Sequence, residues 1–99
     1  MNNRIEITDV IIFPLRNRLP ESKVLAFCRV ILSDEFILHG IKIIEGEFGC
    51  FVAFPSQSEG SPYKMYDCLS LSLRKRLQSE VLKQYSIVIE DYKQLQEMK

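Results

Sequence analysis

The sequence predicts an α+β fold, in which an antiparallel β-meander of four to five strands is followed by a C-terminal amphipathic helix. Three observations lead to this prediction. Residues 4–67 alternate short apolar runs with turn-forming segments. From residue 69 onward the apolar period changes to that of a helix. The chain of 99 residues is long enough for one hydrophobic core and not for two, so we expect a single domain over residues 1–99.

The first strand is expected over residues 5–15. Its start alternates apolar and polar residues, and the run Val10–Phe13 is apolar on both sides. Pro14 then ends the pairing or restricts it to a sheet edge, because proline cannot donate to a ladder. A polar loop is expected over residues 16–22.

The clearest strand covers residues 23–32. One of its faces is wholly apolar, formed by Val24, Ala26, Cys28, Val30 and Leu32. The other face mixes two cations with apolar residues: Lys23, Leu25, Phe27, Arg29 and Ile31. A strand of this kind is expected to pack one face against the core.

Two more strands follow, joined by tight turns. Residues 33–35 form a hairpin turn, since Ser and Asp side chains can bond the local backbone. Residues 36–44 are rich in β-branched side chains and form the next strand. Glycines 46 and 49 bracket a second turn, and residues 50–54 form a short strand that ends at Pro55.

The segment before the helix is a loop over residues 56–62 and a short fifth strand over residues 63–67. The helix is expected over residues 70–85, where Ser70 or Ser72 caps its start. Apolar residues recur there at four-residue spacing: Leu69, Leu73, Leu77, Val81 and Tyr85. The tail carries a weaker helical pattern, which is compatible with a second helix over residues 87–98 or with a frayed end.

Counting faces predicts self-association. Several strands are apolar on both sides, yet a single helix covers roughly one face of a small sheet. The remaining apolar surface needs either the tail or a partner chain. We expect a two-fold homodimer that pairs sheet edges or faces.

Composition narrows the function classes. The formal net charge is +0, so binding to nucleic acid requires a local basic patch. The three cysteines lack ligand spacing and His39 is the only histidine, so we expect free thiols in a reducing cytoplasm and no metal. We find no secretory leader, membrane span or catalytic motif in the sequence and expect a cytoplasmic protein that is not an enzyme, with no cofactor, no small-molecule substrate and no membrane partner.

Three individual positions admit both a functional and a structural interpretation. His39 is expected to be a packed strand residue on the face of Ile37, Ile41 and Ile43, without a catalytic partner. Tyr63 and Tyr66 are candidates for stacking on unpaired bases, although edge-strand residues show the same pattern. Phe48, at a turn tip, is a candidate dimer contact.

The order of these motifs resembles the stage V sporulation protein G (SpoVG) family. The resemblance rests mainly on the block Ile31–Ser56, with His39, Gly46 and Pro55-Ser56, and extends to the first strand and the helix. The matching residues outside the block are Thr8-Asp9-Val10, Leu25-Ala26, Leu77-Gln78, Val81-Leu82 and Tyr85. The resemblance implies a dimeric sheet-and-helix domain that binds DNA and/or RNA and serves gene regulation or septation- and sporulation-type control.

Two departures from the family pattern affect the expected binding surface. The family usually has Lys-Arg directly after the Pro-Ser pair, whereas this chain has Gln57-Ser58-Glu59. The family also has a His-Pro pair shortly before its helix, where this chain has Ser70-Leu71. Lys64, Arg74 and Arg76 match basic positions of the family, and Lys75 adds a further charge.

The candidate nucleic-acid-binding residues are therefore Lys64, Arg74, Lys75 and Arg76. The planar fork of arginine gives two parallel hydrogen bonds to phosphate. Three helix contacts in each subunit would give a salt dependence with a slope of roughly −5 on duplex DNA. The alternative for the run 74–76 is a solvated helix face with Arg76 near Glu80. The alternative for the whole chain is a divergent protein-interaction module that has lost nucleic-acid binding.

Overall fold

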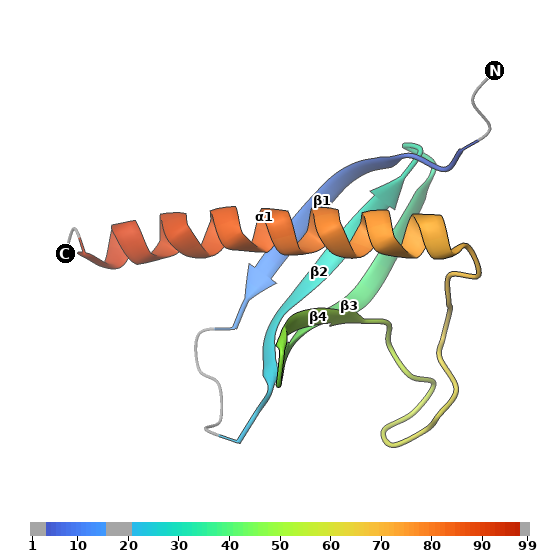
Figure 1. Cartoon of the computed structure of the whole chain (residues 1–99), viewed down its shortest axis with the longest axis horizontal. Coiled ribbons are helices and arrows are strands. Elements are labelled where there is room, and N and C mark those ends of the chain that lie inside the picture. The colour runs from blue at the N-terminus through green and yellow to red at the C-terminus, as the bar shows by residue number, and fades with distance from the viewer. Residues whose placement is uncertain (1–3, 16–20, 98–99) are drawn as a thin grey trace.

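The computed structural model describes residues 4–15 and 21–97. Four strands come first: β1 (Ile7–Pro14), β2 (Val24–Leu32), β3 (Phe36–Gly46) and β4 (Gly49–Ala53). A single helix, α1 (Leu71–Glu97), follows them and lies across one face of the sheet (Figure 1). The strand order is β1-β2-β3-β4 with antiparallel neighbours throughout, which confirms the predicted meander and helix. Most of the loop predicted over residues 16–22 lies outside the described residues.

The core forms where the alternation of β2 and β3 meets the apolar stripe of α1. Ala26, Cys28 and Val30 project from β2, and Ile41 and Ile43 project from β3. The helix adds Leu77 and Val81 from the predicted stripe. Full burial of an aliphatic side chain contributes roughly 1.5–3 kcal/mol, so this layer supplies most of the stabilisation of the fold. Burial also raises the pKa of the Cys28 thiol to about 12, which leaves it protonated and unreactive.

The predicted hairpin turn between β2 and β3 is present. Ser33 and Asp34 both adopt positive φ angles, 51° and 54°, and the amide of Glu35 donates to the carbonyl of Leu32 at 3.0 Å. The hydroxyl of Ser33 accepts from the amide of Glu6, and the hydroxyl of Thr8 accepts from the amide of Asp34. These cross-strand hydrogen bonds stabilise the turn, in which Ser33 adopts a conformation that is rare for residues other than Gly, Asn and Asp.

A β-bulge in β3 corrects the expectation for His39. Cys28 pairs with Ile41 and Val30 pairs with Leu38, so His39 and Gly40 together oppose one residue of β2. The extra residue reverses the side-chain alternation. Ile41 and Ile43 are therefore buried against the helix, whereas His39 is exposed. The prediction that His39 packs on the same face as these isoleucines is wrong.

The short fifth strand predicted over residues 63–67 does not form. The segment makes one isolated bridge, between Ser56 and Lys64. It is held instead by a side chain, because the Tyr66 hydroxyl donates to the carbonyl of His39 and its ring packs 5.2 Å from that of Phe54. Burial is the main cause that raises the pKa of Tyr66 to about 12, with Cys28 adding to it. Tyr66 is thus a structural anchor.

The helix is longer than the predicted span 70–85 and runs without a break for 27 residues. The Ser70 hydroxyl accepts from the amide of Leu73 at 3.1 Å, so Ser70 is the N-cap. Leu69 precedes the helix and is 99% exposed, so it does not belong to the buried stripe. The tail runs beside β1, where Val88 and Tyr92 line one hollow with Ile12 and Pro14. Between Leu71 and Glu97 the helix has no stretch apolar enough to cross a membrane.

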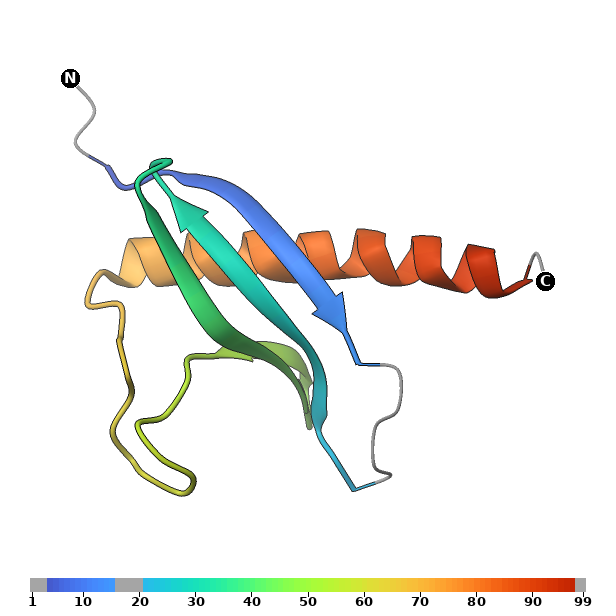
Figure 2. The same cartoon turned by 180° about the vertical axis from the view of Figure 1, so that it is seen from behind.

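The opposite face of the sheet has no helix over it. Figure 2 shows β1, β2 and β3 from this side with α1 behind them. The face count made from the sequence is therefore confirmed for the described chain: one helix covers one face of the sheet, and large apolar side chains remain exposed on the other.

Candidate nucleic-acid interface

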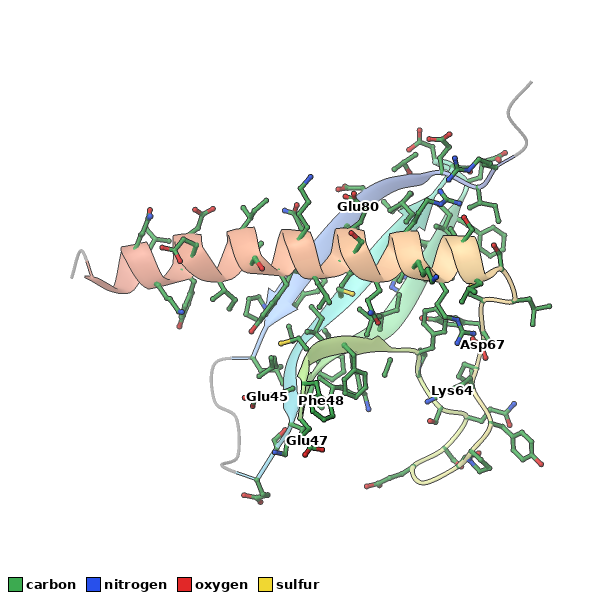
Figure 3. The ribbon with its side chains drawn as sticks, in the orientation of Figure 1. Glu45, Glu47, Phe48, Lys64, Asp67 and Glu80 are labelled. Atoms are coloured by element: carbon green, nitrogen blue, oxygen red, sulfur yellow. The ribbon has the colours of Figure 1, made fainter. Side chains whose placement is uncertain are left out.

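Lys64 and Arg74 are brought together beside the helix. Lys64 comes from the loop before α1 and Arg74 from the first turn of α1, and both line a hollow of about 300 Å³ next to β4. Asp67 lines the same hollow, and Figure 3 shows Asp67 and Lys64 on one side of the helix. Two of the four candidate residues thus share one site, together with an acid.

Arg74 has a structural task within this hollow. Its Nη2 atom donates to the Asp67 carboxylate and to the Cys68 carbonyl, each at 2.7 Å. Both side chains of the ion pair are about half exposed, so solvent screens it and it contributes at most about 1 kcal/mol. The pair fixes the entry of the chain into the helix. It also places a negative charge against the guanidinium that the sequence assigned to phosphate.

Lys75 and Arg76 lie on the β1 side of the helix. They line a second hollow of about 390 Å³ together with Glu6 and Glu80. The Nη1 atom of Arg76 donates to the carbonyl of Ile5 at 3.0 Å, and its Nε atom is buried without a hydrogen-bond partner. Arg76 therefore ties the start of β1 to the helix. Figure 3 shows Glu80 on the opposite side of α1 from Lys64 and Asp67.

The four cations consequently form two separate pairs. Successive helix residues point about 100° apart, so Arg74 and Arg76 are separated by about 200° around the axis. Lys75 lies between them and projects away from the buried Leu73 and Leu77. Of these four candidates, Lys64 and Lys75 are the two that are exposed and have no ion-pair partner among the described residues. The spacing of three consecutive charges already implies this divergence, although the partners of the arginines are visible only in the fold.

The loop that departs from the family pattern forms an exposed, folded-back connection. The amide of Gln57 donates to the carbonyl of Tyr63, and the amide of Ser61 donates to the carbonyl of Ser58. Gly60 turns the chain with a φ of 79°. Glu59 is exposed beside it, so the tip of this loop presents an acid and no cation.

Sequence reasoning passed over two further cations. Arg29 of β2 and Lys42 of β3 lie on the sheet face that has no helix over it, next to Phe27. The mixed outer face of residues 23–32 was the available signal, because it places Arg29 and Phe27 on the same side. Phe48 is 98% exposed at the β3–β4 turn, as its place at a turn tip predicts. Cys28, Cys50 and Cys68 are free thiols.

Comparisons with known proteins identify relatives of this chain. The chain matches the family model described as SpoVG over residues 5–87. It is similar to the "Putative septation protein SpoVG" of Thermoanaerobacter pseudethanolicus, with 40% identity over 83 residues that cover 82% of this chain and 87% of the relative. The protein of that name from Agathobacter rectalis is 34% identical over 89 residues, which cover 88% of this chain and 99% of the relative. The one from Borrelia hermsii is 36% identical over 83 residues, with coverages of 82% and 86%.

Proposed function

Because this chain belongs to the SpoVG family, we propose that it is a homodimeric, non-catalytic regulator that binds DNA or RNA in the cytoplasm and serves septation or gene control. The observation that carries the proposal is the exposure of two lysines, Lys64 in the loop before α1 and Lys75 in the N-terminal half of α1. Their ammonium groups are available to phosphate oxygens, whereas Arg74 and Arg76 are held by Asp67 and Ile5.

The expected electrostatics follow from this division. Each lysine that neutralises a phosphate releases a counterion. Two free lysines in each subunit give four contacts in a dimer, and a salt slope of roughly −4 on duplex DNA. This slope is shallower than the roughly −5 that the helix charges gave when counted from the sequence. The neutral chain agrees with binding that is weak and strongly salt-dependent.

The dimer contact we propose is the apolar rim formed by Ile5, Phe36 and Leu69. These three exposed side chains surround an apolar pocket of about 540 Å³ at the N-terminal end of the helix. Leu69 protrudes next to the pocket on the same surface. A two-fold interface needs a patch that complements itself, and a protruding leucine beside an apolar pocket fits this requirement. A dimer formed through this rim would carry Lys64 and Lys75 of both subunits, which are the four phosphate contacts counted above.

The test is binding of labelled random-sequence duplex DNA and duplex RNA over a series of salt concentrations. Lys64→Gln and Lys75→Gln are each expected to weaken binding and to make the slope shallower by about 2 in the dimer. Lys83→Gln is the matched control, because Lys83 is an exposed lysine two turns further along the same helix. It is expected to leave both quantities nearly unchanged.

Two results would contradict the proposal. Absence of binding to either duplex at low salt would remove the nucleic-acid function. Equal losses in Lys75→Gln and Lys83→Gln would mean that the contact is not at the N-terminal half of the helix. Leu69→Asp tests the dimer separately, since it should convert the sedimenting species to a monomer while the isolated subunit stays folded.

A protein-interaction module is the second candidate function. The Arg74–Asp67 pair, the acidic tip at Glu59 and the exposed Leu69 favour it. In that case the apolar rim would bind a different protein, and Leu69→Asp would abolish co-purification of that partner. Binding to duplex would then be absent, and the lysine substitutions would leave the partner complex intact.

A further inference from the structure

The sheet face opposite the helix carries aromatic rings and cations in its centre. We propose that this face is a stacking surface for the bases of single-stranded DNA or RNA. We call it the open face and define it by Phe13, Phe27, Arg29, Ile31, Ile37 and Lys42. That the ligand is a nucleic acid rests on the proposed function. The site is different, because the open face contains neither Lys64 nor Lys75.

Strand register puts these side chains on one surface. Ala26, Cys28 and Val30 of β2 are buried against α1, so the alternating Phe27 and Arg29 project to the far side. Phe13 of β1 and Lys42 of β3 both pair directly with Phe27. Residues opposite one another on neighbouring strands share a face. Figure 2 shows that no helix of the described residues lies over this side of β1, β2 and β3.

The row Phe13–Phe27–Lys42 has the composition of a single-strand site. Two phenylalanines occupy paired positions on adjacent strands, and a lysine occupies the paired position on the third strand. Phe13 and Phe27 remain 43% and 37% exposed, so a flat ligand has access to the Phe27 ring and to the guanidinium that lies over the Phe13 ring. An unpaired base of any identity can stack on Phe27, while the Lys42 ammonium meets a neighbouring phosphate.

Arg29 strengthens the same surface. Its guanidinium carbon lies 5.0 Å from the centroid of the Phe13 ring, within the range of a cation–π contact. The contact holds the planar guanidinium over the sheet, where it can itself stack on a base or bond a phosphate. Asp9 is the acid of β1 on this face, and it lies at the far end, opposite Ile31, where it accepts from the amide of Val10.

Charge favours a single strand over a second copy of this chain. Two open faces packed together would bury Arg29 and Lys42 of both copies between apolar residues, with Asp9 as the acid at the edge. Burying cations without partners is costly. A polyanion supplies the missing negative charge. A duplex cannot use the rings, because its bases are already stacked and paired.

The open face and the helix lysines make different predictions for different ligands. Lys75 projects from the helix, which covers the other side of the sheet. Duplex binding by phosphate contacts should depend on Lys64 and Lys75 and should not depend on Phe27. An experiment can therefore refute single-strand binding at the open face without refuting duplex binding by the lysines, and the reverse.

The experiment measures binding of full-length protein to oligo(dT), to an abasic oligonucleotide of equal length and to duplex DNA. Phe27→Leu keeps an apolar side chain and removes the ring, so it should lower oligo(dT) affinity about tenfold, the scale of one lost base stack. Phe27→Tyr should retain the affinity. Phe48→Leu is the matched control, because Phe48 is a more exposed phenylalanine at the β3–β4 turn. Duplex affinity should be equal in all three variants.

A direct spectroscopic readout is available because the chain contains no tryptophan. Phe27→Trp introduces a single indole on the open face, and its fluorescence should be quenched by oligo(dT) and not by the abasic strand. Equal affinity for these two strands would overturn the proposal. So would equal losses in Phe27→Leu and Phe48→Leu, or a Phe27→Leu variant that sediments as a monomer where the parent is a dimer, since the face would then belong to a second copy.

Discussion

The two faces of β2 differ in chemistry although they alternate residue by residue. Toward the helix, Ala26, Cys28 and Val30 are small or β-branched, uncharged and almost completely buried. Away from the helix, Phe27 and Arg29 are larger, flat or charged, and exposed. The same strand therefore supplies the core of the fold on one side and a recognition surface on the other.

This difference separates the residues that specify the fold from those that serve binding. A strand with one buried and one solvent-exposed face ordinarily carries polar residues on the exposed face. The open face instead carries aromatic and aliphatic side chains beside two cations, Arg29 and Lys42. Exposed apolar surface of this kind marks an interaction site.

Truncating one isoleucine on each face tests whether the two faces differ in their contribution to stability. Ile41→Ala removes a fully buried side chain beneath the helix, so we expect a loss of roughly 2–5 kcal/mol in the free energy of unfolding. Ile37→Ala, on the open face of the same strand, should cost less than about 1 kcal/mol because Ile37 is already 42% exposed. Urea denaturation of both variants measures the difference. Equal losses would mean that the open face is covered in solution.

The buried face also contains a thiol, Cys28, that makes the stability of the fold depend on pH above pH 9. Burial raises the pKa of Cys28 from 9.0 to about 12, so the folded state keeps a proton that the unfolded chain releases above pH 9. Stability from this group is complete below pH 9 and is lost as the pH rises toward 12. We expect a loss of about 2 kcal/mol between pH 8 and pH 10.5 from Cys28 alone.

Two cysteine variants isolate this contribution. Cys28→Ala is less stable at neutral pH but should show a flatter decline above pH 9, since the titrating thiol is gone. Cys50→Ala should keep the full decline, because Cys50 is exposed on β4. A parallel decline in the parent and in Cys28→Ala would show that the thiol does not titrate between the two states.

Much of the fold could be predicted from periodicity, because its core depends on local patterns. The alternation from Ala26 to Leu32 and the four-residue spacing of Leu73, Leu77 and Val81 each identify a buried face without knowledge of the rest. The prediction that Val24 belongs to this face is wrong, because the register shifts between Val24 and Ala26 and Leu25 packs against the core instead. The hairpin turn at Ser33 and Asp34 was likewise a local signal. The extent of the helix had a weaker local signal, the helical pattern over residues 87–98, and that pattern did not show that the tail continues the first helix and packs beside β1.

The candidate site could be predicted only in part, because it depends on distant partners. Asp67 and the carbonyl of Ile5 engage Arg74 and Arg76, and neither contact is visible in the spacing of the three charges. The bulge at His39 and Gly40 did have a local signal that the sequence-based prediction did not use, because an isolated glycine inside a strand pattern suggests a bulge. A single extra residue in one strand was enough to change which isoleucines are buried.

The smallest expected effect concerns this bulge, which decides how β3 divides its side chains between the two faces. Gly40 has a φ of 78°, and a Cβ atom there would meet the Pro55 ring at 3.7 Å, an ordinary contact. Gly40→Ala should therefore cost about 1–2 kcal/mol from backbone strain alone. Gly40→Asn should cost less, because asparagine tolerates this conformation better. Thermal unfolding of both variants measures the order.

Gly60→Ala is the matched control, because Gly60 has nearly the same φ, 79°, with open space around its Cβ position. It lies in the loop before the helix, where the chain can relax, so its cost should be smaller than that of Gly40→Ala. If the two glycines cost the same, the strain at Gly40 is not held by its neighbours. The bulge would then be free to slip, and with it the assignment of Ile37 and Ile41 to opposite faces of the sheet.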